Sequence, residues 1–210
     1  MSNEDMLKTG TTTVGILSKD SVILAADKRA TAGNFIADKN VKKVMKITDN
    51  IALTIAGSVA DIQLLVKLLR AELKLKELRN SRKPTVKEAA TLLAGMQYRQ
   101  LRYAHGIGHF VVGGYDEKER LFDVFPDGSI MDISETGFVA SGSGSTYAYG
   151  LIEDMYKKDI SKEEAIDLAT RSIHSAMKRD SASGQGIDIM VITKDGINEV
   201  PTKRMNENLS

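Results

Sequence analysis

The sequence predicts an α+β domain in which sheets are sandwiched between helical layers. Segments with strand periodicity and segments with helical periodicity occur in separate blocks, in the order strands, two helices, strands, two helices, strands. A regular alternation of single strands and helices would instead predict a parallel sheet. The chain has 210 residues, enough for a sizeable core, and we find no linker or internal repeat, so we expect one domain.

Four strand-like runs form the first block. They are TTTVGIL at 11–17, SVILAAD at 21–27, KKVMKI at 42–47 and IALTIAG at 51–57. Side-chain alternation along the first run predicts two faces, one with Thr12, Val14 and Ile16 and the other with Thr11, Thr13 and Gly15. Thr12 and Thr13 are therefore expected to be ordinary strand residues.

A long amphipathic helix follows over residues 61–79. Its first apolar stripe contains Ile62, Leu65, Leu69 and Leu73, and a second stripe contains Leu64, Leu68, Leu75 and Leu78. Because this apolar surface is wide, we expect the helix to be covered on two sides, by a sheet and by another subunit.

Capping boxes mark the start of two further helices. Thr85 and Glu88, just after Pro84, open one, and Ser161 and Glu164 open another that carries Ile166, Ala169, Ile173 and Met177. A helix after the SGSGS segment at 141–145 has Tyr147, Leu151 and Met155 on one face. The remaining strand-like runs lie at 109–115, 120–125, 129–133, 187–193 and 197–200.

Composition argues against several classes of function. Lys and Arg number 29 against 28 Asp and Glu, so no basic excess indicates a nucleic-acid partner. The chain has no cysteine, hence no disulfide, thiolate nucleophile or cysteine-based zinc site. No apolar run approaches the length of a membrane span, and the opening MSNEDMLK does not resemble a signal peptide. We expect a soluble, cytoplasmic protein.

The three histidines do not form a recognisable catalytic or metal motif. His105 and His109 are four residues apart, but GIG lies between them, so the spacing is not helical and zinc binding is not favoured. His174 lies among the polar positions of a helix, and the loop SGSGSTY is only a weak signal for anion binding. HExxH, GxSxG and P-loop motifs are absent from the sequence, so a nucleophile would be Ser or Thr with a base other than His.

The segment KTGTTT at 8–13 suggests one such base. The α-amino group of a chain has a pKa of about 7.7–8.0, so it could serve the hydroxyl of the same residue. For Thr11 this requires removal of residues 1–10, and Gly10, which lacks a Cβ, suits the close approach of a hydroxyl to its carbonyl. Attack by the Thr11 hydroxyl, an N-to-O acyl shift and hydrolysis would free the amine.

Six short motifs occur in order: TTTVGI at 11–16, Asp27-Lys28-Arg29, N-x-K-K at 40–43, TIAG at 54–57, SGSGS at 141–145 and RDSASG at 179–184. Together they resemble proteasome β subunits of the archaeal, self-processing type, from Thr11 to about Pro201. The resemblance implies the N-terminal-nucleophile fold, a four-layer αββα sandwich of two antiparallel sheets between helical layers. It also implies a propeptide at 1–10, removed by autolysis, and a single domain at 11–210.

Roles carry over residue by residue from this resemblance. It makes Thr11 the nucleophile, Asp27 and Lys43 its charged partners, and the Gly57 N–H the donor to the oxyanion. Ser143, Asp180 and Ser183 would position the threonine amine and relay protons. Lys42 is the competitor of Lys43, and alternation predicts that the two point in opposite directions.

The resemblance also implies substrate contacts. Thr31 would pair with the bound peptide through its main chain, and a specificity pocket would be formed by Ala30, Val41, Met45 and Ile55. All four pocket residues are apolar, so we expect cleavage after hydrophobic residues, although core packing would explain the same residues.

The implied partners are other subunits and unfolded polypeptides, with no cofactor or metal. The expected assembly is two seven-membered β rings between rings of α subunits, served by an ATPase ring. Two alternatives are a non-catalytic ring subunit and another N-terminal-nucleophile hydrolase, either a small-amide amidase or the bacterial ATP-dependent protease. The presence of Thr11, Asp27 and Lys43 argues against the first, and the TIAG, SGSGS and RDSASG motifs argue against the second.

Overall fold

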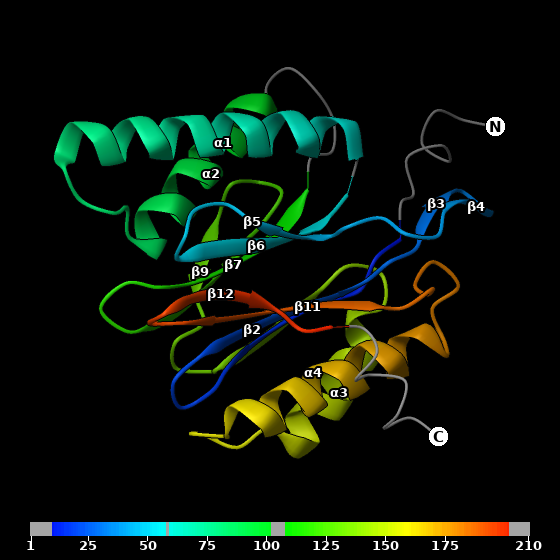
Figure 1. Cartoon of the computed structure of the whole chain (residues 1–210). Coiled ribbons are helices and arrows are strands. Elements are labelled where there is room, and N and C mark those ends of the chain that lie inside the picture. Colours follow the sequence, from blue (N-terminus) through cyan, green and yellow to red (C-terminus); the bar gives the residue numbers. More distant parts are fainter. Residues whose placement is uncertain (1–9, 58, 102–107, 202–210) are drawn as a thin grey trace.

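The computed structural model of the protein describes residues 10–57, 59–101 and 108–201, and these form four layers (Figure 1). Two sheets lie face to face, with α1 and α2 covering one and α3 and α4 covering the other. The helices are α1 (Val59–Asn80), α2 (Val86–Leu101), α3 (Ser145–Met155) and α4 (Lys162–Met177). The αββα sandwich predicted from the sequence is confirmed.

Each sheet has five strands, and all neighbours pair antiparallel. The first has the order β10 (Phe138–Ser141), β1 (Thr13–Leu17), β2 (Val22–Asp27), β11 (Ile187–Thr193) and β12 (Gly196–Glu199). The second has the order β5 (Val44–Lys46), β6 (Ile51–Ala56), β7 (His109–Tyr115), β8 (Glu119–Val124) and β9 (Ile130–Asp132). A separate hairpin pairs β3 (Ala30–Ala32) with β4 (Phe35–Asp38).

The start of β1 lies between β10 and β2 of the first sheet. Thr13 pairs with Ser141 of β10 on one side and with Ala26 of β2 on the other. The residues immediately before β1 are therefore held between the carboxyl ends of two neighbouring strands.

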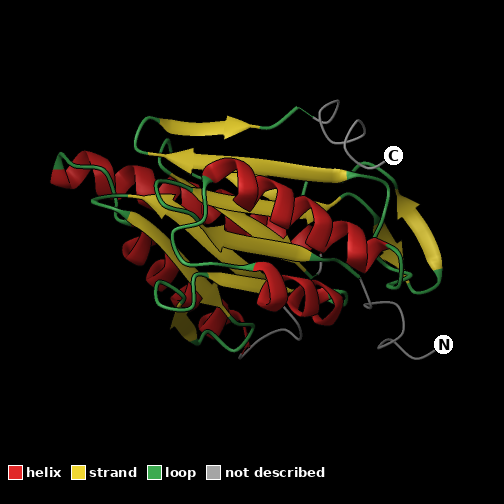
Figure 2. Ribbon diagram, turned by 90° about the horizontal axis from the view of Figure 1, so that it is seen from below, coloured by secondary structure: helices red, strands yellow, loops and turns green. Residues whose placement is uncertain are grey.

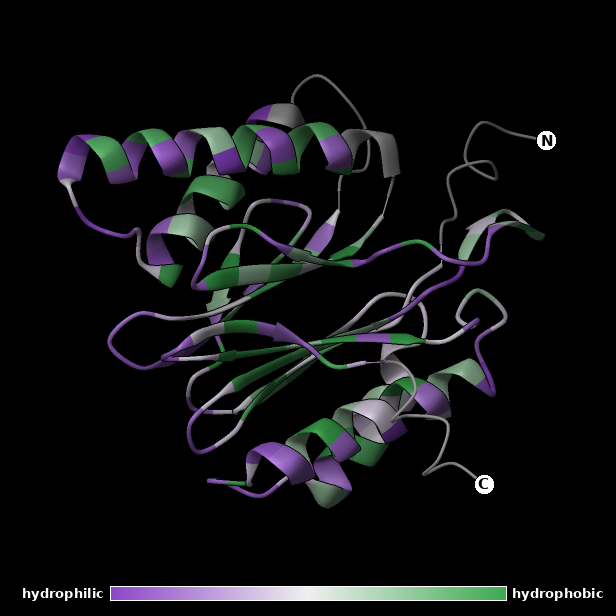
Figure 3. Ribbon diagram, viewed as in Figure 1, coloured by the Kyte–Doolittle hydropathy of each residue, from purple (hydrophilic) through white to green (hydrophobic). Residues whose placement is uncertain are grey.

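Both faces of β1 are buried, which explains its composition. Val14 and Ile16 pack with the α3 and α4 layer, whereas Leu17 belongs to the core between the sheets. At Gly15 a Cβ would lie 2.8 Å from a methyl of Val111, so the glycine lets the second sheet approach closely. Figure 3 shows hydrophobic strands inside the molecule, whereas hydrophilic and hydrophobic residues alternate along the helices.

The two stripes predicted on the first helix have different surroundings. The first stripe is buried, with Ile62, Leu65, Leu69 and Leu73 at most 1% exposed. The second stripe lies on the surface of this single chain, with Leu64 55%, Leu68 46%, Leu75 44% and Leu78 66% exposed. No helix in the described part of the chain has the length and hydropathy that a membrane span needs.

Both capping boxes are confirmed. Before α2, the Glu88 N–H donates to the Thr85 hydroxyl at 3.1 Å and the Thr85 N–H donates to the Glu88 carboxylate at 2.8 Å. Before α4, the corresponding distances between Ser161 and Glu164 are 3.3 and 3.0 Å. Each box satisfies N–H groups that the first turn of a helix leaves without a partner.

The helix predicted after the SGSGS segment is α3, and its predicted face lies beside the buried residues. Ala148 and Ile152 are its buried residues, whereas Tyr147 is 44% exposed and Leu151 and Met155 only flank the core. Figure 2 shows the helices packed along the sheets, and in α3 the residues turned inward are Ala148 and Ile152. The strand β10 and the hairpin β3–β4 were not predicted from the sequence.

A pair of leucines on α1 tests this packing. Leu69→Ala should lower the free energy of unfolding by about 2–5 kcal/mol, because it leaves a cavity under the helix. Leu64→Ala should change it by less than about 0.5 kcal/mol, because that side chain is half exposed. Urea denaturation of the isolated chain measures both, and equal losses would contradict the orientation of α1.

Candidate active site

Thr11 lies just before β1 and is almost completely buried, with 4% of its surface exposed. Its peptide bond to Gly10 is intact in this structure, and its hydroxyl donates to the Gly10 carbonyl oxygen at 2.7 Å. The Lys43 Nζ lies 3.5 Å from the same oxygen. A hydroxyl and an amine thus converge on one peptide carbonyl, which they polarise.

Asp27, the last residue of β2, holds Lys43 in this place. Its side chain is fully buried, and its Oδ1 accepts from the Lys43 Nζ and from the Thr12 N–H, each at 2.9 Å. Its Oδ2 accepts from the backbone N–H groups of Arg29 at 3.0 Å and Gly184 at 2.9 Å. These bonds compensate for the removal of the carboxylate from water.

Burial lowers the pKa of Lys43 below its ordinary value of 10.5, and the carboxylate of Asp27 opposes this shift. Desolvation disfavours the ammonium form, so a larger fraction of the lysine is neutral than in water. The Lys43 Nζ and the Thr11 hydroxyl contact the same Gly10 oxygen, so a neutral Lys43 amine would be close enough to serve as a base for that hydroxyl.

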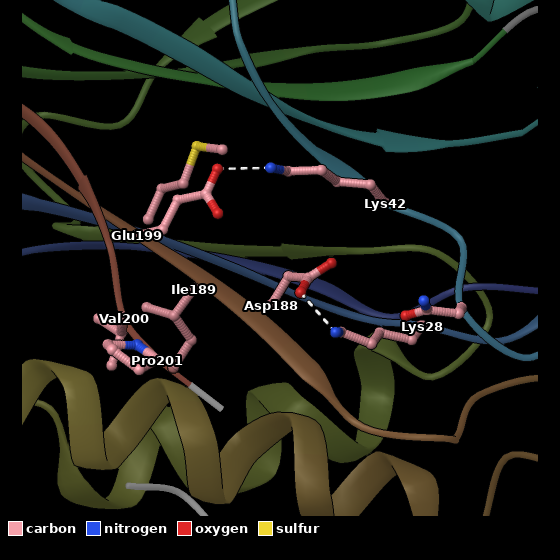
Figure 4. A pocket seen from close by; sticks show the side chains of 9 residues that line it. Lys28, Lys42, Asp188, Ile189, Glu199, Val200 and Pro201 are labelled. Carbon is pink, nitrogen blue, oxygen red and sulfur yellow. Dashed lines mark hydrogen bonds and ion pairs between the residues drawn. The ribbon is translucent and has the colours of Figure 1, made fainter. Parts of the chain in front are cut away.

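The neighbouring Lys42 points away from this cluster, as alternation predicts. It is exposed and pairs with Glu199, while Lys28 pairs with Asp188 at 3.0 Å (Figure 4). These two ion pairs line a surface pocket of about 460 Å³ beside β11 and β12. Lys42 is therefore not positioned to act on Thr11.

Ser143, Asp180 and Ser183 come together on the other side of Thr11. Asp180 Oδ2 accepts from the hydroxyls of Ser143 and Ser183, each at 2.6 Å. The Thr11 N–H donates to the Ser143 Oγ at 3.2 Å. The residue 11 nitrogen, which would become the free amine after cleavage, is thus bound to the serine that Asp180 orients.

The glycines of the SGSGS loop bring it close to Thr11. The Gly144 N–H lies 3.4 Å from the Thr11 carbonyl oxygen, and a Cβ at Gly142 would lie 2.0 Å from it. The loop therefore packs against the carbonyl of Thr11. This is the loop whose sequence is a weak signal for anion binding.

Gly57 follows β6 and has a φ of 142°, a conformation that favours glycine. Among the described contacts none joins Gly57 to Thr11. The strand β6 links Gly57 to the site, because the N–H of Ile55 on β6 donates to the Lys43 carbonyl oxygen at 2.9 Å.

Thr31 contacts the segment that precedes Thr11. It lies on β3, and its buried hydroxyl oxygen accepts from the Gly10 N–H at 3.1 Å. The contact seen here is made by the side chain, whereas the predicted contact to substrate is made by the main chain.

The predicted pocket residues lie on neighbouring segments: Ala30 on β3, Val41 before β5, Met45 on β5 and Ile55 on β6. Ala30 and Val41 are half-buried. Met45 and Ile55 pack against the core under α1 and α2, and Ile55 is only 7% exposed. Core packing therefore accounts for part of this set, as the sequence allowed.

No group of three or more His, Asp and Glu side chains capable of holding a metal occurs within the residues that the structure describes. His109 bonds through its Nε2 to Asp123 at 2.6 Å, and His105 lies outside the described residues. His174 is half-buried on α4. Residues 1–9 of the predicted propeptide also lie outside the described part.

Two residues of the cluster were not predicted to take part. The Thr12 hydroxyl lies 2.7 Å from the Ser183 Oγ, so Thr12 is more than a strand residue. The Arg29 guanidinium donates to the Ser181 carbonyl at 2.6 Å and to the Gln185 side chain, across the loop that carries Ser183. Arg29 belonged to a recognised motif, whereas nothing in the sequence separates Thr12 from Thr13.

The comparisons with known proteins agree with this arrangement. A family model described as proteasome subunit matches residues 7–192. "Proteasome subunit beta" of Ferroglobus placidus is 49% identical over 191 residues, covering 90% of each chain. The protein of the same name from Archaeoglobus profundus is 45% identical, over 99% of this chain and 95% of its own. That of Methanocaldococcus jannaschii is 48% identical, over 92% and 85%.

The contact at Gly10 yields a prediction. A Cβ on Gly10 would lie 1.7 Å from the Ala182 Cβ, so Gly10→Ala should displace the residue 10 carbonyl and slow cleavage before Thr11. Combining it with Ala182→Gly removes the clashing atom and should restore part of the rate. Intact mass spectrometry over time measures both. Normal processing of Gly10→Ala would show that the contact is unimportant.

The shifted pKa of Lys43 predicts a pH dependence of stability. The unfolded chain keeps the lysine proton up to about pH 10.5, whereas the folded chain releases it at lower pH. Between the two pKa values the unfolded state binds more protons, so the free energy of unfolding should rise with pH there.

Urea denaturation of a Thr11→Ala chain, with and without Lys43→Met, isolates this contribution. Asp27→Asn should lower the pKa of Lys43 further, because Asp27 raises it, and should extend the window downward. An identical pH slope with and without Lys43 would contradict the shift.

Proposed function

The chain belongs to the proteasome subunit family, and on that premise we propose that it is a catalytic β subunit of the proteasome core. It is a threonine endopeptidase that degrades unfolded polypeptides to short peptides. The observation that carries the proposal is the Thr11 hydroxyl at 2.7 Å from the Gly10 carbonyl oxygen, with the Lys43 Nζ on the same oxygen.

The first reaction of this site is removal of residues 1–10. The Thr11 Oγ attacks the Gly10 carbonyl carbon while Lys43 takes up the hydroxyl proton. The bond from Gly10 to the residue 11 nitrogen breaks and the nitrogen gains a proton, which leaves an ester on the Thr11 Oγ. Water hydrolyses the ester, and residues 11–210 remain with a free α-amine.

The same hydroxyl then cleaves substrates. Its proton moves to the α-amine, the Oγ forms an ester with the acyl part of the peptide, and the leaving amine takes the proton. Water releases the acyl product. Lys43 and Asp27 maintain the charge balance, and the Gly57 N–H stabilises the oxyanion. The α-amine is held by Ser143, Asp180 and Ser183.

Substrate binding completes the proposal. Thr31 pairs with the peptide main chain, and Ala30, Val41, Met45 and Ile55 favour cleavage after hydrophobic residues. The apolar character of these four supports this preference.

The subunit assembles with other proteasome subunits. We propose two seven-membered β rings between rings of α subunits, with an ATPase ring that unfolds substrates. The half-exposed leucines of α1 support a covered face, because single chains rarely expose such a contiguous apolar stripe. A cytoplasmic location fits a chain without cysteine.

Assembly with purified α-type proteasome subunits allows a direct test. Intact mass should correspond to a chain that begins at Thr11, and the particle should degrade a long unfolded protein. Thr11→Ala should abolish both processing and turnover. A full-length chain with full peptidase activity would refute the mechanism, and hydrolysis of small amides alone would favour an amidase.

Lys43 and Lys42 form a matched pair for the base. Lys43→Ala should lower kcat by at least about 100-fold, since it removes the base of self-cleavage and so leaves no free α-amine to accept the Thr11 proton. Lys42→Ala should leave kcat within about twofold, because Lys42 is exposed and pairs with Glu199. Turnover of fluorogenic peptides measures both, and the reverse result would reassign the base.

A further inference from the structure

We propose that Thr12 is a positioning residue of this site: its hydroxyl anchors the hydrogen-bonded chain that holds the nitrogen of Thr11. The inference rests on the proposed function, because that nitrogen matters only if it becomes the α-amine. Thr12 is fully buried, and its Oγ1 lies 2.7 Å from the Ser183 Oγ. From Ser183 the chain continues through Asp180 and Ser143 to Thr11.

Counting protons determines the direction of each bond. A serine hydroxyl has one proton, and that of Ser183 is donated to the Asp180 carboxylate at 2.6 Å. The Ser183 oxygen can therefore only accept from Thr12, so Thr12 is the donor at 2.7 Å. On the other branch, the Ser143 proton goes to Asp180, and its oxygen accepts from the Thr11 N–H.

The result is a symmetric arrangement about one carboxylate oxygen. Asp180 Oδ2 orients two serines, one of which accepts from the residue 11 nitrogen and the other from the Thr12 hydroxyl. Hydrogen bonds in such a chain polarise one another, so losing the terminal donor weakens the bond between Ser183 and Asp180. Asp180 then holds Ser143, and with it the nitrogen, less firmly.

Packing confirms that the Thr12 hydroxyl lies between two loops. A Cβ at Gly144 would be 2.0 Å from the Thr12 Oγ1 and 3.2 Å from Asp180 Oδ2. The hydroxyl is therefore enclosed by the 141–145 loop on one side and by the 180–184 loop on the other. It is placed to keep these two loops in register with the start of β1.

Thr13, the next residue and the first of β1, provides a matched control. Its side chain is also fully buried, and its hydroxyl lies 2.8 Å from that of Ser141. The described contacts of this pair do not lead to Asp180. Replacing either threonine by valine removes one buried hydroxyl bond of the same kind, but only the change at Thr12 should affect the amine.

The experiment compares Thr12→Val, Thr12→Ser and Thr13→Val in the assembled, processed particle. Thr12→Val should lower kcat about 2- to 10-fold, the value of one hydrogen bond, and leave KM unchanged because Thr12 does not touch substrate. Thr12→Ser, which keeps the hydroxyl, should restore kcat. Thr13→Val should match the wild type in kcat while losing as much stability to urea as Thr12→Val.

A double-mutant cycle with Ser183→Ala identifies the route. If Thr12 acts through Ser183, Thr12→Val should have little further effect on kcat in the Ser183→Ala particle. Equal kcat losses for Thr12→Val and Thr13→Val, or additive losses in the cycle, would overturn the inference. Should Thr12→Val not assemble, failure of Thr12→Ser to retain wild-type kcat would overturn it. Inactivity of the wild-type particle would instead refute the proposed function.

Discussion

The buried carboxylate of Asp27 is the contact on which the rest of the site depends. It accepts from segments far apart in the sequence: the Thr12 N–H at the start of β1, the Arg29 N–H beyond β2, the Lys43 Nζ and the Gly184 N–H. A charge this deeply buried is tolerated only when nearly all of its acceptor positions are used. The same hydrogen bonds that satisfy the carboxylate therefore hold the segments of the site together. If one segment moves away, the buried carboxylate of Asp27 loses a partner, and its removal from water is no longer fully compensated.

This constraint also explains how a lysine can serve as a base. An ion pair at the surface would keep Lys43 protonated, and a lysine buried alone would lose its charge and its fixed position. Here desolvation lowers the pKa of Lys43 while Asp27 limits the shift and fixes the Nζ near the Gly10 carbonyl. Burial thus sets the direction of the pKa shift, and the contact with Asp27 limits the shift and fixes the position of the Lys43 Nζ.

The sequence predicted the layers and the residues of the charged cluster, but not all of its connections. Periodicity identified α1 and α4, and ordered motifs brought Thr11, Asp27 and Lys43 together. For α3, periodicity identified the face of Tyr147, Leu151 and Met155, but not that the buried residues are Ala148 and Ile152, each one position further along the chain from Tyr147 and Leu151. It could not distinguish Thr12 from Thr13, since these are adjacent buried threonines, and the fold brings a different serine to each. Such differences arise from tertiary register, which local pattern does not contain.

The position of Gly10 bears on how one nucleophile can serve two reactions. No side chain fits there, because a Cβ would clash with Ala182, and the Gly10 N–H is held by the Thr31 hydroxyl. A substrate residue with a large apolar side chain cannot take this position, although the proposed specificity requires such residues.

The conflict disappears when the covalent bond between the acyl residue and the Thr11 nitrogen is considered. In self-cleavage the acyl residue is bonded to the nitrogen of Thr11 itself, so its path is dictated by β1. A substrate carbonyl has no such connection, and once residues 1–10 have left it can approach with its side chain directed elsewhere. The glycine is therefore a requirement of the proposed processing alone.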